Sequence, residues 1–148
     1  MKEVYVGIGS NIEPKTYINK VKKELQNYFE CTFSDNYKYD PVGFNGPEFI
    51  NLVVKFTTNL PFKEVEEILS KIEISLGRNE GQRGFSNRVI DLDILLFGSL
   101  VIEGKKSLPH KNLDSSLFVL EPLVELAADL IHPISKKTFK EILDNLKN

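Results

Sequence analysis

Two aspartates lie inside the most apolar stretch of the chain, residues 88–98, which reads RVIDLDILLFG. In a β-strand, side chains two residues apart point to the same face, about 7 Å apart along the strand, so Asp91 and Asp93 would project together. In a helix they would diverge by about 200°, since each residue turns by about 100°. A strand would place Leu95 and Phe97 on the aspartate face as well. The side chains expected on the opposite face, packed on the core, are Ile90, Leu92, Ile94 and Leu96.

The other segments place this strand in an α+β fold. Helical periodicity follows Pro14 and Pro61, and Gly77 is positioned to end the second helix. Strands are expected at residues 4–9, 32–39, 49–57 and 88–98. The resulting order, β-α-β-β-α-β, is that of a ferredoxin-like antiparallel sheet with helices packed on it.

A C-terminal hairpin and helical extension is expected after this unit. A weak strand is predicted at residues 100–103, a helix at residues 116–130, and a last short helix capped by Ser135 or Thr138. No repeat, low-complexity tract or linker divides the sequence. We therefore expect residues 1–148 to form a single domain.

The composition favours a soluble globular protein. Of the 148 residues, 41% are hydrophobic and 27% are charged, which is ordinary for such proteins. A formal net charge of -2 argues against nucleic-acid binding through bulk basic charge. There is no targeting segment and no run of 18 apolar residues, so we expect no membrane association and a cytoplasmic location. The single cysteine, Cys31, is expected to be a small core residue.

The carboxylate pair needs a counter-charge. Two close carboxylates repel each other unless a cation or a proton lies between them. Mg²⁺ takes oxygen ligands and is often held by one or two carboxylates together with substrate phosphates. Asp91 and Asp93 therefore suggest a magnesium site, although the same pattern also fits a half-solvated strand whose aspartates face water.

An arginine- and glycine-rich loop precedes the strand. Arg78, Arg83 and Arg88 lie within eleven positions, interleaved with glycines. Guanidinium groups bind phosphate oxygens in a bidentate manner, and a glycine-rich loop can close over a ligand. Incidental arginines in a solvated loop are the alternative. The chain has no GxxxxGK[ST] phosphate loop, and its GIGSNI segment lacks the third glycine of a dinucleotide fingerprint, so phosphate chemistry here needs another fold.

These features resemble one known family. The motifs that carry the resemblance are Gly9-Ser10-Asn11, Gly77-Arg78, Arg88-x-x-Asp91-Leu92-Asp93-Ile94, Pro109-His110 and Phe118-Val119-Leu120-x-Pro122-Leu123. In this order, and over nearly the whole chain, they are similar to the 6-hydroxymethyl-7,8-dihydropterin pyrophosphokinase family of folate biosynthesis.

The resemblance implies an enzyme with two small-molecule substrates, ATP and a reduced pterin. It would transfer a pyrophosphoryl group from ATP to the pterin hydroxymethyl oxygen and release AMP, on a ferredoxin-like fold. Asp91 and Asp93 would hold two Mg²⁺ ions that bridge the ATP phosphates. The residues implied at the nucleotide and its phosphates are Arg78, Arg88, His110 and Lys111, of which Arg78 and Arg88 are also expected to take part in catalysis.

The resemblance also implies a pterin site. Asn51 would read the edge of the heterocycle, together with backbone groups of Val42 and Gly43, and Phe49 and Phe118 would sandwich the flat ring. From the residues alone, Asn51 fits an outward polar strand position equally, and the two phenylalanines fit the core.

Several positions depart from the family pattern. Ser86-Asn87 stands where a Gly-Pro pair is common, Phe85 replaces a frequent tryptophan, and Gly81 replaces a basic residue. Ser116 stands where an arginine is expected, which would cost a phosphate contact unless Arg83, Lys105 or Lys111 supplies it.

Two other functions stay open at this point. One is a ferredoxin-like module that binds a ligand without catalysis, and the other is a relative that acts on a different heterocycle. A monomer or a weak homo-oligomer is expected in each case.

Overall fold

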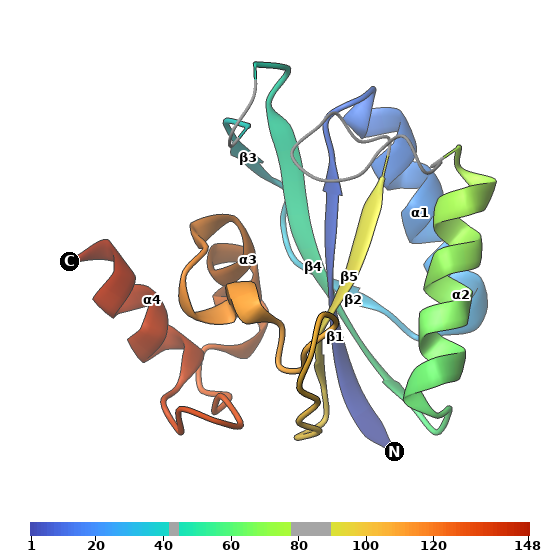
Figure 1. Ribbon diagram of the computed structural model, residues 1–148. Coiled ribbons are helices and arrows are strands. Elements are labelled where there is room, and N and C mark those ends of the chain that lie inside the picture. Colours follow the sequence, from blue (N-terminus) through green and yellow to red (C-terminus); the bar gives the residue numbers. More distant parts are fainter. Residues whose placement is uncertain (42–44, 78–89) are drawn as a thin grey trace.

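The computed structural model describes residues 1–41, 45–77 and 90–148, and these form an antiparallel sheet packed between helices (Figure 1). The strands in this part of the chain are β1 (Lys2–Ser10), β2 (Thr32–Phe33), β3 (Tyr37–Tyr39), β4 (Phe49–Thr58) and β5 (Asp91–Phe97). Their order is β2-β4-β1-β5, with β3 also paired to β4, and every pairing is antiparallel. The predicted α+β class is confirmed.

The helices divide between the two faces of the sheet. Figure 1 shows α1 (Pro14–Tyr28) and α2 (Phe62–Ser75) on one side, and α3 (Leu117–Ala127) and α4 (Phe139–Lys147) on the other. A short 3₁₀ helix, η1 (Lys111–Asp114), precedes α3. Among the helices of the described residues, none is long and apolar enough to cross a membrane.

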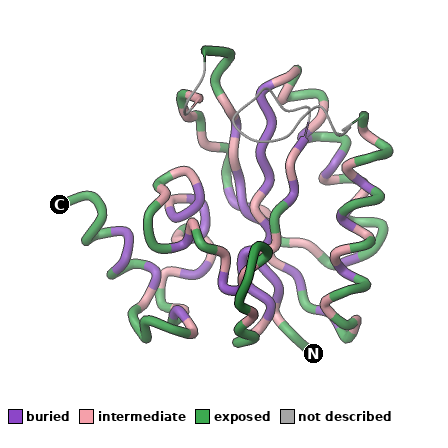
Figure 2. Tube along the Cα trace, in the orientation of Figure 1, coloured by how far each residue is buried: buried purple, intermediate pink, exposed green. Residues whose placement is uncertain are grey.

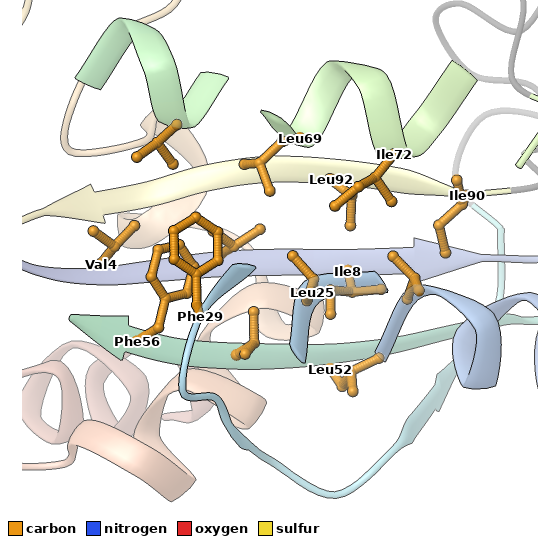
Figure 3. Close-up of a cluster of buried hydrophobic side chains, with 14 of the residues drawn as sticks. Val4, Ile8, Leu25, Phe29, Leu52, Phe56, Leu69, Ile72, Ile90 and Leu92 are labelled. Carbon is orange, nitrogen blue, oxygen red and sulfur yellow. The ribbon is translucent and has the colours of Figure 1, made fainter. Parts of the chain in front are cut away.

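The face under α1 and α2 holds the larger core. Alternate residues of β1, including Val4 and Ile8, meet buried side chains of both helices (Figure 3). Phe29, just after α1, stacks on Phe56 of β4 with ring centroids 3.9 Å apart and planes 12° from parallel. This packing explains why residues 88–98 are so apolar, because Leu92 contributes to the same cluster.

The opposite face is covered only in part. Tyr5, Val53 and Leu95 pack there against α3, where Leu120 and Leu123 are fully buried. Figure 2 shows the buried positions running along the strands and the inner faces of the helices. The part of this face beyond α3 carries the polar residues described below.

A β-bulge corrects one sequence prediction. The register between β1 and β5 shifts between Tyr5 and Val6, which pair with Leu96 and Ile94, so Leu95 is an extra residue. A bulge reverses the alternation of side chains beyond it. Leu96 therefore lies on the aspartate face and Phe97 on the opposite face, contrary to the expectation from strict alternation.

The strand expected at residues 32–39 is interrupted. Ser34 donates its backbone N–H to Val53 O at 2.8 Å, but its side-chain oxygen, rather than its carbonyl, accepts the N–H of Val53, at 2.9 Å. Because a side chain takes the place of a backbone acceptor, the ladder breaks after β2 and resumes at β3.

The C-terminal elements are shorter than predicted. The hairpin strand at residues 100–103 is a single bridge, in which Ile102 and Leu108 exchange two hydrogen bonds of 2.9 Å, and the N–H of His110, which would continue the ladder, donates to Leu95 O instead. Helix α3 ends at Ala127 rather than residue 130. The carbonyls of Ala128 and Leu130 instead accept N–H groups from the first turn of α4.

Capping of α4 gives a stability prediction. Thr138 Oγ1 accepts the N–H of Glu141 at 3.1 Å, and Glu141 Oε1 accepts the N–H of Thr138 at 3.2 Å. Thr138→Ala removes one half of this capping box, so it should lower the free energy of unfolding by about 1 kcal/mol. Urea denaturation measures the change. The control Ser135→Ala keeps its backbone N–H to His132 Nδ1 (3.2 Å) and should change stability by less than about 0.5 kcal/mol; equal losses would rule out this capping role.

Candidate functional site

The predicted carboxylate pair faces two glycines on the neighbouring strand. Asp91 pairs in register with Gly9 and Asp93 with Gly7, and on the far side of β1 the partner of Gly9 is Asn51. Asp93 is exposed and Asp91 is half-buried. The two carboxylates therefore share one face of β5, as the strand prediction required.

Gly9, which lies between Asn51 on β4 and Asp91 on β5, has no side chain and leaves an open surface on the sheet, called here the glycine floor. Neighbouring strands lie about 4.8 Å apart, so Asn51 and Asp91 are roughly 10 Å from each other across Gly9. A Cβ atom at Gly9 would come within 2.8 Å of Asn51 Oδ1, so the amide lies directly over the glycine. The result is a space bordered by an amide on one side and by carboxylates on the other.

The aromatic residues expected at the pterin lie beside this floor. Phe49 is half-buried at the start of β4, two residues before Asn51, and its partner on β3 is Tyr39. The ring of Tyr39 meets the ring of Phe118, at the start of α3, with centroids 6.3 Å apart and planes at 66°. The fold thus gathers Phe49, Asn51 and Phe118 at one end of the sheet.

A cavity of about 310 Å³ opens on the other side of the aspartates, between α2 and residues 105–111, which run from the hairpin turn to the start of η1. Its volume lies at the lower end of the range for small-molecule pockets. Its charged and polar side chains are Glu66, Ser70, Glu73, Asp93, Lys105, Lys106, Ser107, His110 and Lys111, and its apolar ones are Phe62, Leu69, Leu92, Ile94 and Leu108. Asp93 thus borders both the glycine floor and a cavity rich in lysine.

Glu73 is a site residue that the sequence analysis missed. Its Oε2 accepts the backbone N–H of Leu92, between the two aspartates, at 2.8 Å. Among the described strands, β5 lies at the edge of the sheet, so no neighbouring strand accepts the N–H of Leu92 on its outer side. The Glu73 carboxylate accepts it instead. A signal was available, because Glu66, Ser70 and Glu73 repeat at helical spacing beside the buried stripe of α2.

His110 is held rigidly beside the aspartates. Its backbone N–H donates to Leu95 O at 2.9 Å, and its Nδ1 accepts the N–H of Asn112 at 3.1 Å. The neutral ring therefore carries its proton on Nε2. Burial lowers the pKa of His110, the charge of Lys111 lowers it further, and Asp91 opposes these effects. At neutral pH, His110 is an uncharged hydrogen-bond donor.

The donor set suits magnesium better than a metal that needs a closed protein cage. Within residues 1–41, 45–77 and 90–148, no group of three or more His, Cys, Asp or Glu side chains could hold a metal. Mg²⁺ keeps several waters and usually binds one or two carboxylates plus phosphate oxygens. Asp91 and Asp93 on an accessible face meet that requirement.

Some predicted residues fall outside the described part of the chain. These are Val42 and Gly43 of the expected pterin loop, and Arg78, Arg83 and Arg88 of the expected phosphate loop. The positions around them are described: Gly77 ends the turn after α2 with a φ of 102°, and Ile90 is fully buried before β5.

The geometry defines a class of protein: a carboxylate pair beside a cavity lined by lysines and acidic side chains, at one edge of an antiparallel sheet, is typical of proteins that hold a phosphate-bearing ligand through divalent cations. The profile of the 7,8-dihydro-6-hydroxymethylpterin-pyrophosphokinase family matches residues 5–128.

Individual relatives agree with this match. A 2-amino-4-hydroxy-6-hydroxymethyldihydropteridine pyrophosphokinase of Aquifex aeolicus is 37% identical over 145 residues, covering 95% of this chain and 90% of the relative. Proteins of the same name from Haemophilus influenzae and Bacillus subtilis are 36% and 37% identical, over 92% and 82% of this chain and 88% and 76% of their own length. The chain belongs to the 7,8-dihydro-6-hydroxymethylpterin-pyrophosphokinase family, and the sequence-based assignment is confirmed.

The glycine floor gives a testable prediction. In Gly9→Ala, the new Cβ atom would lie 2.8 Å from Asn51 Oδ1, which is too short for a van der Waals contact. The Asn51 amide should therefore be displaced. The fold should survive, because the end of a side chain can move. NMR spectra should show a shifted Asn51 side-chain NH₂ signal. The control Gly7→Ala places its Cβ 3.5 Å from Leu95 Cδ2, an ordinary contact, and should leave that signal in place. An unchanged Asn51 signal in Gly9→Ala would contradict the crowding.

The environment of His110 predicts its titration. Its midpoint should fall below the ordinary value of about 6.5. Lys111→Ala should raise the midpoint and Asp91→Asn should lower it. Between the folded midpoint and about pH 6.5 the unfolded chain binds more protons at this position, so its contribution to stability is lost as the pH falls through that window. NMR titration of the imidazole signals, assigned with a His110→Asn variant, checks the order; a midpoint above 6.5 would contradict it.

Proposed function

We propose that this enzyme transfers a pyrophosphoryl group from ATP to the hydroxymethyl oxygen of 6-hydroxymethyl-7,8-dihydropterin and releases AMP. The observation that carries the proposal is the arrangement around Gly9: an amide and aromatic rings on one side, and a carboxylate pair beside a cavity that three lysines line on the other. Two ligands placed on these two sides would meet at the aspartates.

Two further proposals concern the architecture. The strand order β2-β4-β1-β5 and the helices following β1 and β4 support a ferredoxin-like arrangement, in which β2 and β3 together take the place of one strand. We also propose that residues 1–148 act as one pyrophosphokinase domain. A cytoplasmic location and a monomeric or weakly associating state stay predictions.

The nucleotide is assigned to the cavity. Lys105 and Lys111 line it beside Asp93, and the Nε2–H of His110 can donate to a phosphate or ribose oxygen without adding charge. Either lysine is proposed to supply the phosphate contact that the family arginine would make at the position of Ser116. Arg78 and Arg88 are proposed to bind phosphates from the preceding loop.

Magnesium is assigned to the aspartates. Asp91 and Asp93 would hold two Mg²⁺ ions, which when bound neutralise the triphosphate and polarise the β-phosphoryl group. Glu73 accepts the N–H of Leu92 and thereby holds the strand backbone between Asp91 and Asp93.

The pterin is assigned to the other side of the glycine floor. The Asn51 amide offers donors and an acceptor to the heterocycle edge, and backbone groups of Val42 and Gly43 would complete that edge. Phe49 and Phe118 would stack on the ring faces, and we propose that the hydroxymethyl arm points toward the aspartates across Gly9.

The reaction is a single in-line displacement. The hydroxymethyl oxygen forms a bond to the β-phosphorus, the bond between that phosphorus and the α-phosphate oxygen breaks, AMP leaves, and the hydroxyl proton passes to solvent. The protein contributes alignment and charge neutralisation more than a strong base. The rigid backbone at His110 and β5 supplies the alignment.

An assay that separates AMP from ADP tests the proposal. With MgATP and the reduced pterin, the wild type should release AMP and form the pterin diphosphate ester. Release of ADP would indicate single phosphoryl transfer. A folded wild type without turnover would point to a binding module, and turnover only with another heterocycle would point to a different substrate.

The carboxylate pair gives a matched variant. Asp93→Ala should reduce kcat at least about 100-fold, because it removes a ligand from the metal site, while the melting temperature without Mg²⁺ stays unchanged since a like-charged neighbour is removed. The control Asp144→Ala changes an exposed aspartate of α4 and should keep full activity. A large loss of thermal stability in Asp93→Ala would show that Asp93 is structural instead.

A further inference from the structure

Two tyrosines of β3 bind two glutamates of α3. Tyr37 donates its hydroxyl proton to Glu125 Oε1 at 2.8 Å, and Tyr39 donates to Glu121 Oε1, also at 2.8 Å. The rings are 6.5 Å apart and within 10° of parallel. The two hydrogen bonds form successive rungs of a ladder between a strand and a helix.

The spacing of the two elements makes the ladder possible. Residues i and i+2 of a strand are about 6.6–7 Å apart on one face, and residues i and i+4 of a helix are about 6 Å apart along its axis. Tyr37 and Tyr39 therefore match Glu125 and Glu121 when strand and helix run in opposite directions. Each glutamate has a second partner, because Glu125 also accepts the N–H of Asp35 at 3.0 Å and Glu121 Oε2 lies 3.4 Å from Lys147 Nζ.

The Tyr39 rung lies next to the proposed pterin site. Glu121 is one helical turn after Phe118, and the Tyr39 ring meets the Phe118 ring edge-on at 6.3 Å. Tyr39 is also the cross-strand partner of Phe49. It therefore touches the side chain of one expected stacking residue and pairs in register with the other.

We propose that the hydrogen bond from Tyr39 to Glu121 sets the separation of Phe118 from Phe49, which makes Tyr39 and Glu121 positioning residues for the pterin ring. The inference rests on the proposed function, because it assigns the aromatic pair to that substrate. The Tyr39 bond, one helical turn from Phe118, controls the separation of the two phenylalanine rings. Tyr37, the register partner of Asn51, bonds Glu125 nearer the end of α3 and does not contact Phe118 through this bond.

The rung persists over the working pH range. Burial raises the pKa of Tyr39, and the hydrogen bond to Glu121 and the charge of that carboxylate raise it further. The phenol therefore stays protonated and remains the donor. Lys147 balances the carboxylate charge, so α4 supports the same contact.

Tyr39→Phe tests the inference by removing only the hydroxyl. The dissociation constant of the reduced pterin, measured by fluorescence titration with a non-hydrolysable ATP analogue present, should rise about three- to tenfold, the loss expected for one hydrogen bond. The dissociation constant of the ATP analogue should stay within about twofold. Tyr37→Phe is the matched control, since it removes the same atom from the other rung, and it should change pterin binding less than twofold.

A double-mutant cycle separates positioning from a general loss of structure. Glu121→Ala should weaken pterin binding as Tyr39→Phe does, and the double variant should lose clearly less than the sum of the two single losses, because the variants share the Tyr39–Glu121 hydrogen bond although Glu121 also pairs with Lys147 and the Tyr39 hydroxyl also lies 3.4 Å from Leu117 O. Equal pterin affinity in Tyr39→Phe and the wild type, additive losses in the double variant, or equal weakening in Tyr37→Phe would each overturn the inference.

The outcome for the proposed function is separate. An active wild type that releases AMP, with unchanged pterin binding in Tyr39→Phe, would overturn this inference alone. A folded wild type that neither binds the pterin nor releases AMP would overturn the proposed function and this inference with it.

Discussion

The alternation of side chains along β5 is the constraint on which the site depends. Ile90 and Leu92 point into the core beneath α1 and α2, and this burial holds the strand in one register. The same alternation presents Asp91 and Asp93 together on the other face, where the facing residues of β1 are glycines. A strand slipped by one residue would bury two carboxylates, so the core packing that stabilises the fold also maintains the ligand face.

Backbone hydrogen bonds then give this face its rigidity. Glu73 takes the N–H of Leu92 at the sheet edge, and His110 is tied to Leu95 O through its own N–H. Both contacts join the aspartate strand to segments that line the lysine-rich cavity. Carboxylates and lysines consequently line the same cavity, and a polyanion with divalent cations can satisfy both sets at once.

The side of the site that holds Asn51, Phe49 and Phe118 is built differently, because helix α3 packs across the short strand β3. The ladder between β3 and α3 sets where Phe118 lies, whereas Asn51 and Phe49 are placed by β4 itself. The separation of the two aromatic rings thus depends on hydrogen bonds between elements about 80 residues apart in sequence. Ser116, where the family pattern has an arginine, is the N-cap residue of that same helix.

The sequence by itself determined the carboxylate face, the strand and helix order and the family, because each depends on local periodicity, turn residues or motif spacing. It left the cap of the last helix open between Ser135 and Thr138, and the structure shows Thr138. Only the tertiary structure decided the bulge that sends Leu96 and Phe97 to opposite faces from those predicted, the side-chain bond at Ser34 that splits a strand, and the shortened α3. The roles of Glu73, Tyr39 and Glu121 likewise appeared only in three dimensions. Their partners are distant in sequence, and which distant groups meet is set by the packing of whole elements rather than by any local pattern.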